Sequence, residues 1–180
     1  MLNLEDLTPG IWTIDPSHSA ITFVARHLVI TKVRGTFGEV SGTLTITEDK
    51  LASAVEATIG MASITTGDDS RDGHLKSAEF FDVENHPTMT FVSTGLRGDG
   101  AEYVLTGDLT IKGITKTLEL DLEFEGVSPD PWGGTRVGFS AVGTINRRDF
   151  GLDFDVKLDT GGALVSEKIK IELEVQAVKA

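Results

Sequence analysis

Residues 116–126 read KTLELDLEFEG, and this segment decides the fold class of the chain. Leu118, Leu120, Leu122 and Phe124 alternate with four acidic residues, so the apolar residues recur at every second position. In a β-strand this period places the apolar side chains on one face, whereas a helix would scatter them around its circumference. The segment therefore predicts a strand with one buried face and one face in water.

The same alternation recurs along the chain. It is strict in residues 167–175 (EKIKIELEV) and looser in six further segments. These six are residues 21–27, 40–46, 55–61, 89–91, 103–111 and 137–145. Short, turn-like connections between successive segments favour antiparallel pairing. We therefore expect an all-β fold, an extended eight-stranded antiparallel up-and-down barrel, because closure removes the exposed edges that a sandwich retains.

Two segments lack the alternation. Residues 68–87 (DDSRDGHLKSAEFFDVENHP) begin with residues that cap helices and predict a short helix near residues 70–81. We interpret this stretch as the lid and rim of a hollow barrel, with Arg71 and the neighbouring aspartates as surface charges, capping charges or ion pairs that fix the lid. A helical turn is predicted near residues 146–150.

Composition limits the classes of function. The chain has 180 residues, which suits one domain spanning residues 1–180. Its formal net charge of −12 predicts repulsion from phosphate backbones and anionic lipid surfaces, and no nucleic-acid partner is expected. The absence of cysteine excludes disulfides and thiolate chemistry.

The chain also lacks recognisable targeting features. Residues 1–10 contain no apolar run typical of a signal peptide, and no stretch approaches the roughly 18 apolar residues of a membrane span. We therefore expect a cytoplasmic protein, or a periplasmic or secreted one if a leader was removed.

The predicted inner face combines large residues with very small ones. Phe23 and Phe91 share it with Gly107 and Gly143. Small residues there can leave a channel or mark bulges, and a packed core is the alternative. An eight-stranded barrel is wide enough inside to hold one slender ligand, so both a hollow and a filled barrel remain open at this point.

Four blocks in order along the chain carry a family resemblance. They read WTIDPSHSAITFVARHLVITKVRGTFGEVSGTL (12–44), SRDGHLKSAEFFDVENHPTMTF (70–91), LTGDLTIKGITKTLEL (105–120) and INRRDFGL (145–152). Together they resemble the YceI-like family, the polyisoprenoid-binding proteins. The resemblance implies a lipocalin-like barrel whose long apolar pocket binds a polyprenyl chain such as a quinone precursor, for carriage or storage. It also implies a possible homodimer, since dimers occur in the family.

Ligand-binding candidates are the apolar residues expected on the inner face and at the lid. They are Ile21, Phe23, Ala25, His27, Phe37, Val55, Ile59, Phe80, Phe81, Met89, Phe91, Tyr103, Leu105, Leu120, Leu122, Phe124, Val137 and Phe139. Five polar residues are candidates for the rim or for contact with a polar head group. They are His18, Arg34, His74, Arg147 and Asp149.

Two alternatives to lipid binding remain. One is a small enzyme that acts on a lipidic substrate with His27 or His74 as acid–base group. No triad partner and no metal-ligand spacing accompany these histidines, so we expect no catalytic residues, metal or cofactor. The other is a structural or stress-related interaction module, which predicts a barrel filled with side chains.

Overall fold

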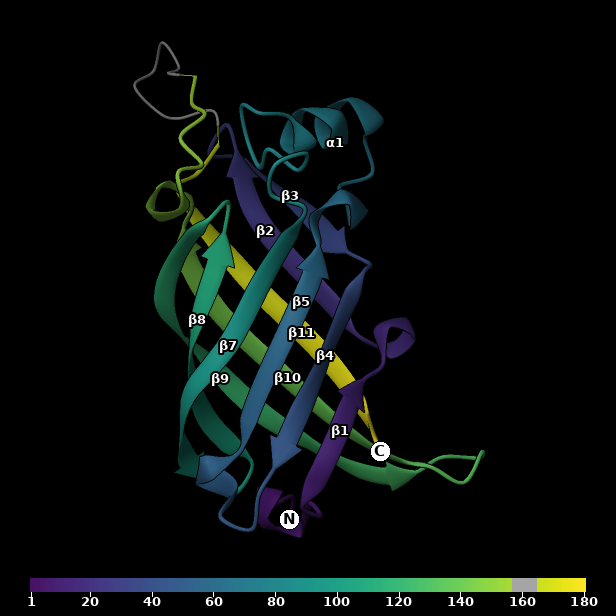
Figure 1. Cartoon of the computed structure of the whole chain (residues 1–180). Coiled ribbons are helices and arrows are strands. Elements are labelled where there is room, and N and C mark those ends of the chain that lie inside the picture. The colour runs from purple at the N-terminus through teal and green to yellow at the C-terminus, as the bar shows by residue number, and fades with distance from the viewer. Residues whose placement is uncertain (157–164) are drawn as a thin grey trace.

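The computed structural model describes residues 1–156 and 165–180. Within these ranges the chain forms a closed antiparallel β-barrel (Figure 1). The eight strands of the ring are, in spatial order, β1 (Gly10–Ile14), β4 (Val40–Ile46), β5 (Ala54–Gly60), β7 (Thr88–Asp99), β8 (Glu102–Ile111), β9 (Ile114–Pro129), β10 (Thr135–Asn146) and β11 (Lys168–Lys179). Pairing of β1 with β11, which sets Trp12 opposite Lys179, closes the ring. The predicted eight-stranded antiparallel barrel is confirmed.

Residues 116–126, whose strict alternation predicted a strand, lie in β9. Leu120 and Phe124 are buried there, while Glu119, Asp121 and Glu123 are exposed. β9 pairs with β8 on one side and with β10 on the other, so it is a central strand of the meander from β7 to β11. Its alternation therefore gives the orientation of the whole sheet, with the apolar face turned inward.

One strand of the ring differs from the prediction. The predicted strand at residues 21–27 is β2 (Ala20–His27), which pairs with the first half of β11, whereas β1 pairs with the last residues of β11 and occupies the ring. The two are separated by the 3-10 helix η2 (Pro16–His18), where Pro16 lacks the N–H that a continuous strand would need. A hairpin partner of β2, β3 (Thr31–Phe37), and the short β6 (Ile64–Thr65) extend the sheet beyond it.

The two predicted helical segments are present. α1 (Asp69–Lys76) is followed by turns, and the 3-10 helix η5 (Arg147–Phe150) follows β10. α1 lies at the upper end of the barrel in Figure 1, and both chain termini lie at the lower end. No helix in the described ranges is long and apolar enough to cross a membrane.

The lower end of the barrel is filled by side chains. Trp12 and Ala177 are 0% exposed there, and the Trp12 Nε1–H donates to the carbonyl of Thr8 at 3.2 Å. The 3-10 helix η1 (Leu4–Asp6) covers this end, held by the Leu4 N–H, which donates to the Gly100 carbonyl at 2.9 Å. The remaining 3-10 helices are η3 (Lys50–Ala52) and η4 (Met61–Ser63). Because side chains fill the lower end, any space for a ligand must lie in the middle and upper parts of the barrel.

Candidate functional site

The barrel encloses a cavity of about 710 Å³. Pockets that hold drug-sized ligands measure about 300–1,000 Å³, so this volume fits a small or slender molecule. Inward-facing residues such as Phe23, Phe91, Leu122, Ile171 and Leu173 are only partly buried, although they point away from bulk solvent. A packed interior would have buried them fully. The prediction of a filled barrel, which the interaction-module alternative required, is therefore wrong.

Most of the predicted ligand-binding residues line this cavity. They are Ile21, Phe23, Ala25, His27, Phe37, Val55, Ile59, Phe80, Phe81, Met89, Phe91, Leu105, Leu120, Leu122 and Phe139. The period-two pattern placed these residues on the inner face, and closure of the ring turns that face toward one shared space. Their contact with a ligand stays a prediction.

Three residues of the same prediction lie outside the cavity lining. Tyr103, Phe124 and Val137 are 6%, 2% and 1% exposed and belong to the packed core. The Phe124 ring packs against Phe139 with centroids 5.7 Å apart, and the Tyr103 hydroxyl donates to the Gly100 carbonyl at 3.2 Å. They face inward, but at the floor of the barrel, where η1 fills the space. The alternation along a strand predicts which side chains face inward, but it does not predict how far along the barrel axis each of them lies.

Other lining residues were not named as candidates. β11 contributes Ile169, Ile171, Leu173 and Val175, which carry the same inner-face signal that identified their strand. Phe154, by contrast, lies in an irregular segment after η5 with no periodic pattern, so no sequence signal marked it. Its ring contacts His74 with centroids 4.6 Å apart.

α1 and the turns after it flank one end of the cavity. Phe80 and Phe81 both line the cavity, with ring centroids 5.2 Å apart, and Phe81 also packs against Phe37 at 6.4 Å. The lining reaches the surface at Asp68, Ser70 and Arg71, which are exposed. We call this region, together with the exposed Arg26 of β2, the mouth of the cavity. The interpretation of this stretch as lid and rim agrees with its position.

Hydrogen bonds hold α1 against the preceding strand. The Asp68 carboxylate accepts from the Arg71 N–H at 3.0 Å and caps the helix. Asp72, buried at 8% exposure, accepts from the N–H and the hydroxyl of Thr66, and hydrogen bonding by the Thr66 hydroxyl is the main cause that lowers the pKa of this carboxyl. Arg71 donates to the Thr66 hydroxyl at 2.7 Å. These charges therefore act through caps and hydrogen bonds to Thr66.

Of the five rim candidates, two line the cavity. These are His74 and Arg147, whereas His18, Arg34 and Asp149 do not line it. Arg34 points outward from β3, is 56% exposed and pairs with Glu172 at 3.2 Å. Lys32 and Arg34 occupy outward positions of β3, and the inward positions carry Thr31 and Gly35 beside Val33 and Phe37. The apolar alternation is therefore weak, which is why β3 was not predicted.

Arg147 is the most deeply buried cation of the cavity wall. It is 1% exposed and donates to the backbone carbonyls of Leu152, Val165 and Ser166. Among the described residues, no carboxylate lies within ion-pair distance of it, and burial lowers the pKa of its guanidinium below the ordinary value. Carbonyls carry no full negative charge, and Asp155, Glu167 and Asp153 act on the guanidinium only from beyond ion-pair distance. Arg147 is therefore the candidate partner for an anionic or phenolic oxygen inside an otherwise apolar space.

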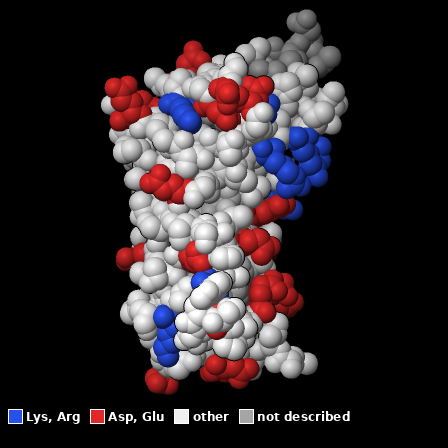
Figure 2. Space-filling view, turned by 90° about the vertical axis from the view of Figure 1, so that its right-hand side faces the viewer, with Lys and Arg blue, Asp and Glu red and all other residues white. Residues whose placement is uncertain are grey.

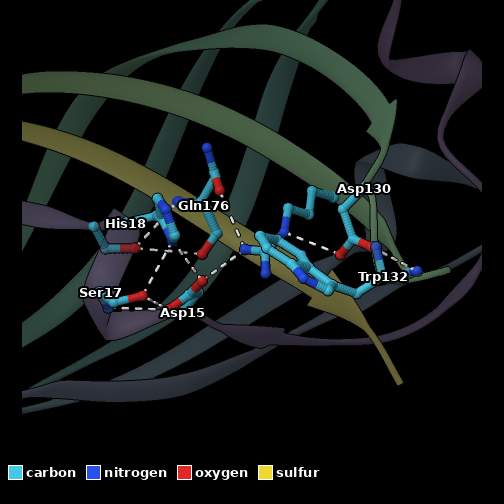
Figure 3. Close-up of polar contacts among 9 residues, drawn as sticks. Asp15, Ser17, His18, Asp130, Trp132 and Gln176 are labelled. Carbon is cyan, nitrogen blue, oxygen red and sulfur yellow. Dashed lines mark hydrogen bonds and ion pairs between the residues drawn. The ribbon is translucent and has the colours of Figure 1, made fainter.

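A second polar cluster lies on the outside of the barrel (Figure 3). Asp15, the N-cap of η2, accepts from Arg136 at 2.6 Å, and Arg136 also donates to Asp130 at 3.1 Å and to Gln176 at 3.3 Å. The Arg136 guanidinium lies over the Trp132 ring, 5.9 Å from its centroid. The cluster joins the β1–β2 junction to β10, β11 and the β9–β10 loop.

Asp15, Ser17 and His18 of this cluster do not form a catalytic triad. In a triad the two imidazole nitrogens face the acid and the nucleophile separately. Here the single Nδ1 of His18 lies 3.0 Å from the Ser17 hydroxyl and 2.8 Å from Asp15, while that hydroxyl itself donates to Asp15 at 2.7 Å. The arrangement is a capped 3-10 turn that directly precedes β2.

The two histidines of the cavity also lack such geometry. His74 Nε2 contacts Glu79 at 2.8 Å, and the Glu79 side chain is 68% exposed. His27 lines the cavity near the end of β2 and pairs through its backbone with Val165. No group of three metal-binding side chains occurs within residues 1–156 and 165–180.

The fold and the cavity define an all-β barrel of the lipocalin-like kind, built around an apolar ligand space. The sequence model of the YceI-like domain matches residues 12–177, and the chain belongs to the YceI-like family. A UPF0312 protein of Pectobacterium carotovorum is 39% identical over 163 residues, which cover 90% of this chain and 82% of that protein.

Solved structures show the same fold. The Campylobacter jejuni YCEI protein aligns with a TM-score of 0.74 and 32% identity, covering 86% of this chain and 90% of that one. A polyisoprenoid binding domain from Saccharophagus degradans aligns with a TM-score of 0.73 and 15% identity. The alignment covers 96% of this chain and 100% of that one. These likenesses show the fold, and the expectation that the chain is not an enzyme stays a prediction.

Proposed function

We propose that the chain binds a long-chain isoprenoid or a similar amphiphilic lipid, of the polyprenyl quinone-precursor type, for carriage or storage. The observation that carries this proposal is the lining of the cavity, which is aliphatic and aromatic over most of its surface. The polar lining residues of the α1 segment, Thr66, Asp68, Arg71 and His74, lie at or next to the mouth. An apolar chain with one polar end matches this distribution.

The binding energy follows from burial of the chain. Each buried CH₂ contributes about 0.8 kcal/mol, so a few isoprene units suffice for tight binding without a charged anchor. Affinities saturate near about −18 to −21 kcal/mol, which means that a longer chain gains little. The ligand is therefore selected mainly by shape and apolarity.

The polar head of the ligand has one favoured position. Arg147 lines the cavity, and its partners Val165 and Ser166 contact the end of β2 beside the mouth, since the Ser166 N–H donates to the Arg26 carbonyl at 2.9 Å. An anionic or phenolic head group there would compensate the buried charge of Arg147. The tail would then extend toward the floor at Leu4 and Ile14.

The structural neighbour from Saccharophagus degradans, a polyisoprenoid binding domain, supports the same ligand class through its fold. Nothing in the cavity favours catalysis, because neither His27 nor His74 is joined to both an acid and a nucleophile among the described residues. Binding is thus the function that the geometry supports best.

The test uses two adjacent residues of β7. Phe91 lines the cavity, and Val92 faces outward at 44% exposure. We expect Phe91→Asp to weaken uptake of a fluorescent geranylgeranyl probe at least ~tenfold, because it places an unpaired carboxylate in apolar surroundings. Val92→Asp should leave probe uptake unchanged, because the added charge remains in water.

Circular dichroism and thermal unfolding report whether each variant keeps the barrel. If Phe91→Asp unfolds, Ile171→Trp serves instead, since it fills the cavity with an apolar side chain and should lower probe capacity while the sheet persists. Equal loss of uptake in the two β7 variants, or full uptake in Ile171→Trp, would contradict an apolar chain inside the barrel.

A further inference from the structure

The β2–β3 hairpin presents three consecutive apolar side chains to solvent at its tip. Leu28, Val29 and Ile30 are 37%, 62% and 78% exposed. The tip follows His27, which lines the cavity, so it lies beside the mouth. Single exposed apolar residues are ordinary, but a run of three at one turn is a feature that marks interaction sites.

The backbone of this turn is unfavourable for the residues that occupy it. The Ile30 N–H donates to the His27 carbonyl at 3.2 Å, and the two central residues, Leu28 and Val29, have φ of 56° and 67°. The β2–β3 loop has three residues, because His27 pairs with Thr31. Its first turn has the two positive φ values of a type I′ turn, in which Gly, Asn and Asp predominate. A β-branched valine at such a φ is an outlier. Leucine and valine at these positions therefore destabilise the turn. What they provide instead is two large apolar side chains exposed to solvent at the tip of the hairpin.

The hairpin is also basic within an acidic chain. Residues 20–38 contain Arg26, Lys32 and Arg34 and no acidic residue, although the whole chain carries −12. Arg26 and Lys32 lie directly opposite each other in the β2–β3 register and are exposed, while Arg34 pairs with Glu172 of β11. Figure 2 shows a patch of Lys and Arg side chains in the upper half of the molecule, and acidic side chains are the more frequent charged groups on the rest of that face.

This local charge changes the expectation drawn from composition. Charges separated by more than about 8–10 Å are largely screened at physiological salt, so an approaching surface responds to the nearest side chains and not to the net charge. Apolar side chains bracketed by cations are the pattern of segments that insert into the interface of anionic bilayers.

We propose that the β2–β3 tip, residues 26–34, docks the barrel onto anionic lipid bilayers, with Leu28, Val29 and Ile30 in the interface and Arg26 and Lys32 at the head groups. Docking places the mouth against the membrane, so a water-insoluble ligand can pass between bilayer and cavity without crossing water. The proposed membrane-docking surface is argued from the tip residues alone. Only its use in ligand transfer rests on the proposed function.

The test measures co-sedimentation of the full chain with vesicles of phosphatidylglycerol and phosphatidylcholine, and with vesicles of phosphatidylcholine alone. We expect binding to the anionic vesicles only. Arg26→Gln with Lys32→Gln should lower the partition constant about 10- to 30-fold, from about fivefold for each cation, and raised salt should have the same direction of effect.

The decisive variant replaces the strained residues with the pair that the turn favours, Leu28→Asn with Val29→Gly. Vesicle binding should fall on the order of a hundredfold, because two large apolar groups are removed, while the thermal midpoint should rise or stay constant. A purely structural role for the two side chains would lower the midpoint instead and would overturn the proposal. The matched control is Trp132→Ser, which removes a 79% exposed side chain of the β9–β10 loop, outside the mouth.

Three other results would also overturn the proposal. They are equal binding to neutral and anionic vesicles, loss of binding in Trp132→Ser with retention in the tip variant, and no vesicle binding by the unmodified chain. Self-association that the tip variant abolishes, without vesicle binding, would assign the tip to a second copy of the chain. Because the vesicles contain no isoprenoid, these outcomes are independent of whether the cavity binds one.

Discussion

At Gly35 and Gly107, the space beside the glycine is occupied by a phenylalanine ring from a neighbouring strand. A methyl group at Gly35 would overlap Phe23, and one at Gly107 would overlap Phe91. An aromatic ring that packs over a glycine on the neighbouring strand stabilises the sheet at a position where the glycine has no side chain of its own. Composition left open whether Gly107 opens a channel or marks a bulge. The Phe91 ring occupies the space beside this glycine, and Gly107 pairs with Ser93 next to the register shift of β7, so it lies beside a bulge.

The Gly35–Phe23 contact gives a prediction for a single methyl group. Gly35→Ala should push the Phe23 ring into the cavity, since the ring is the movable partner and space exists only on that side. Overpacking of this kind costs about 1–3 kcal/mol of unfolding free energy, so the barrel should still fold. We expect urea unfolding to show that loss, and uptake of a long probe chain to fall more than uptake of a short one.

Gly38→Ala is the control for this change. No atom lies within 4 Å of a methyl group at Gly38, which follows directly after β3. It should not lower the unfolding free energy, which we expect to rise by about 0.4–1 kcal/mol through the reduced entropy of the unfolded chain, and it should leave the chain-length preference unchanged. If Gly35→Ala left both quantities unchanged, the Phe23 ring would not be the wall of the cavity at this point.

At the level of elements, the break between β1 and β2 is the feature that sequence could not reveal. β1 has only five residues, GIWTI, which are too few to establish a period, and β3 has only Val33 and Phe37 as apolar residues on its inward face. The long strands were predictable because six or more alternating residues leave no other interpretation. Which strand closes the ring depends on which segment pairs with each half of β11. Such pairing between residues far apart in the sequence cannot be read from a local pattern.

The Asp15–Arg136 cluster holds this break in place and predicts a pH dependence. Hydrogen bonding by Arg136 is the first cause that lowers the pKa of the Asp15 carboxyl far below its usual range. A depressed pKa in the folded state means that the stabilisation is fully present above the unfolded value, about 3.9, and is lost as pH falls toward the folded value. The cluster should therefore stabilise the fold at neutral pH and progressively less below about pH 5.

Urea unfolding of the unmodified chain and of Asp15→Asn checks this dependence. We expect Asp15→Asn to be less stable at pH 7, with the difference narrowing between about pH 5 and pH 3. Glu56→Gln, which removes an exposed carboxylate on β5, should show no such pattern. A difference between Asp15→Asn and the unmodified chain that stays constant down to pH 3 would mean that the carboxylate does not act through its charge.

At the scale of the whole molecule, the fold class and the family were accessible from the sequence and the cavity was not. Alternation tells which face of each strand turns inward, but the volume left inside depends on how eight faces meet and on how far η1 fills the floor. For that reason Tyr103, Phe124 and Val137 were grouped with residues that line the cavity. The expected homodimer stays a prediction, checked by sedimentation of the purified chain.

The central claim is that the cavity of the barrel holds a long apolar chain. Native mass spectrometry of freshly purified protein tests it most directly. We expect an adduct of several hundred daltons, on the order of tens of heavy atoms, that Ile171→Trp diminishes and that organic extraction identifies as a lipid with one polar end. Protein that emerges without an adduct, and that takes up no polyprenyl or fatty chain when exposed to one, would contradict the account.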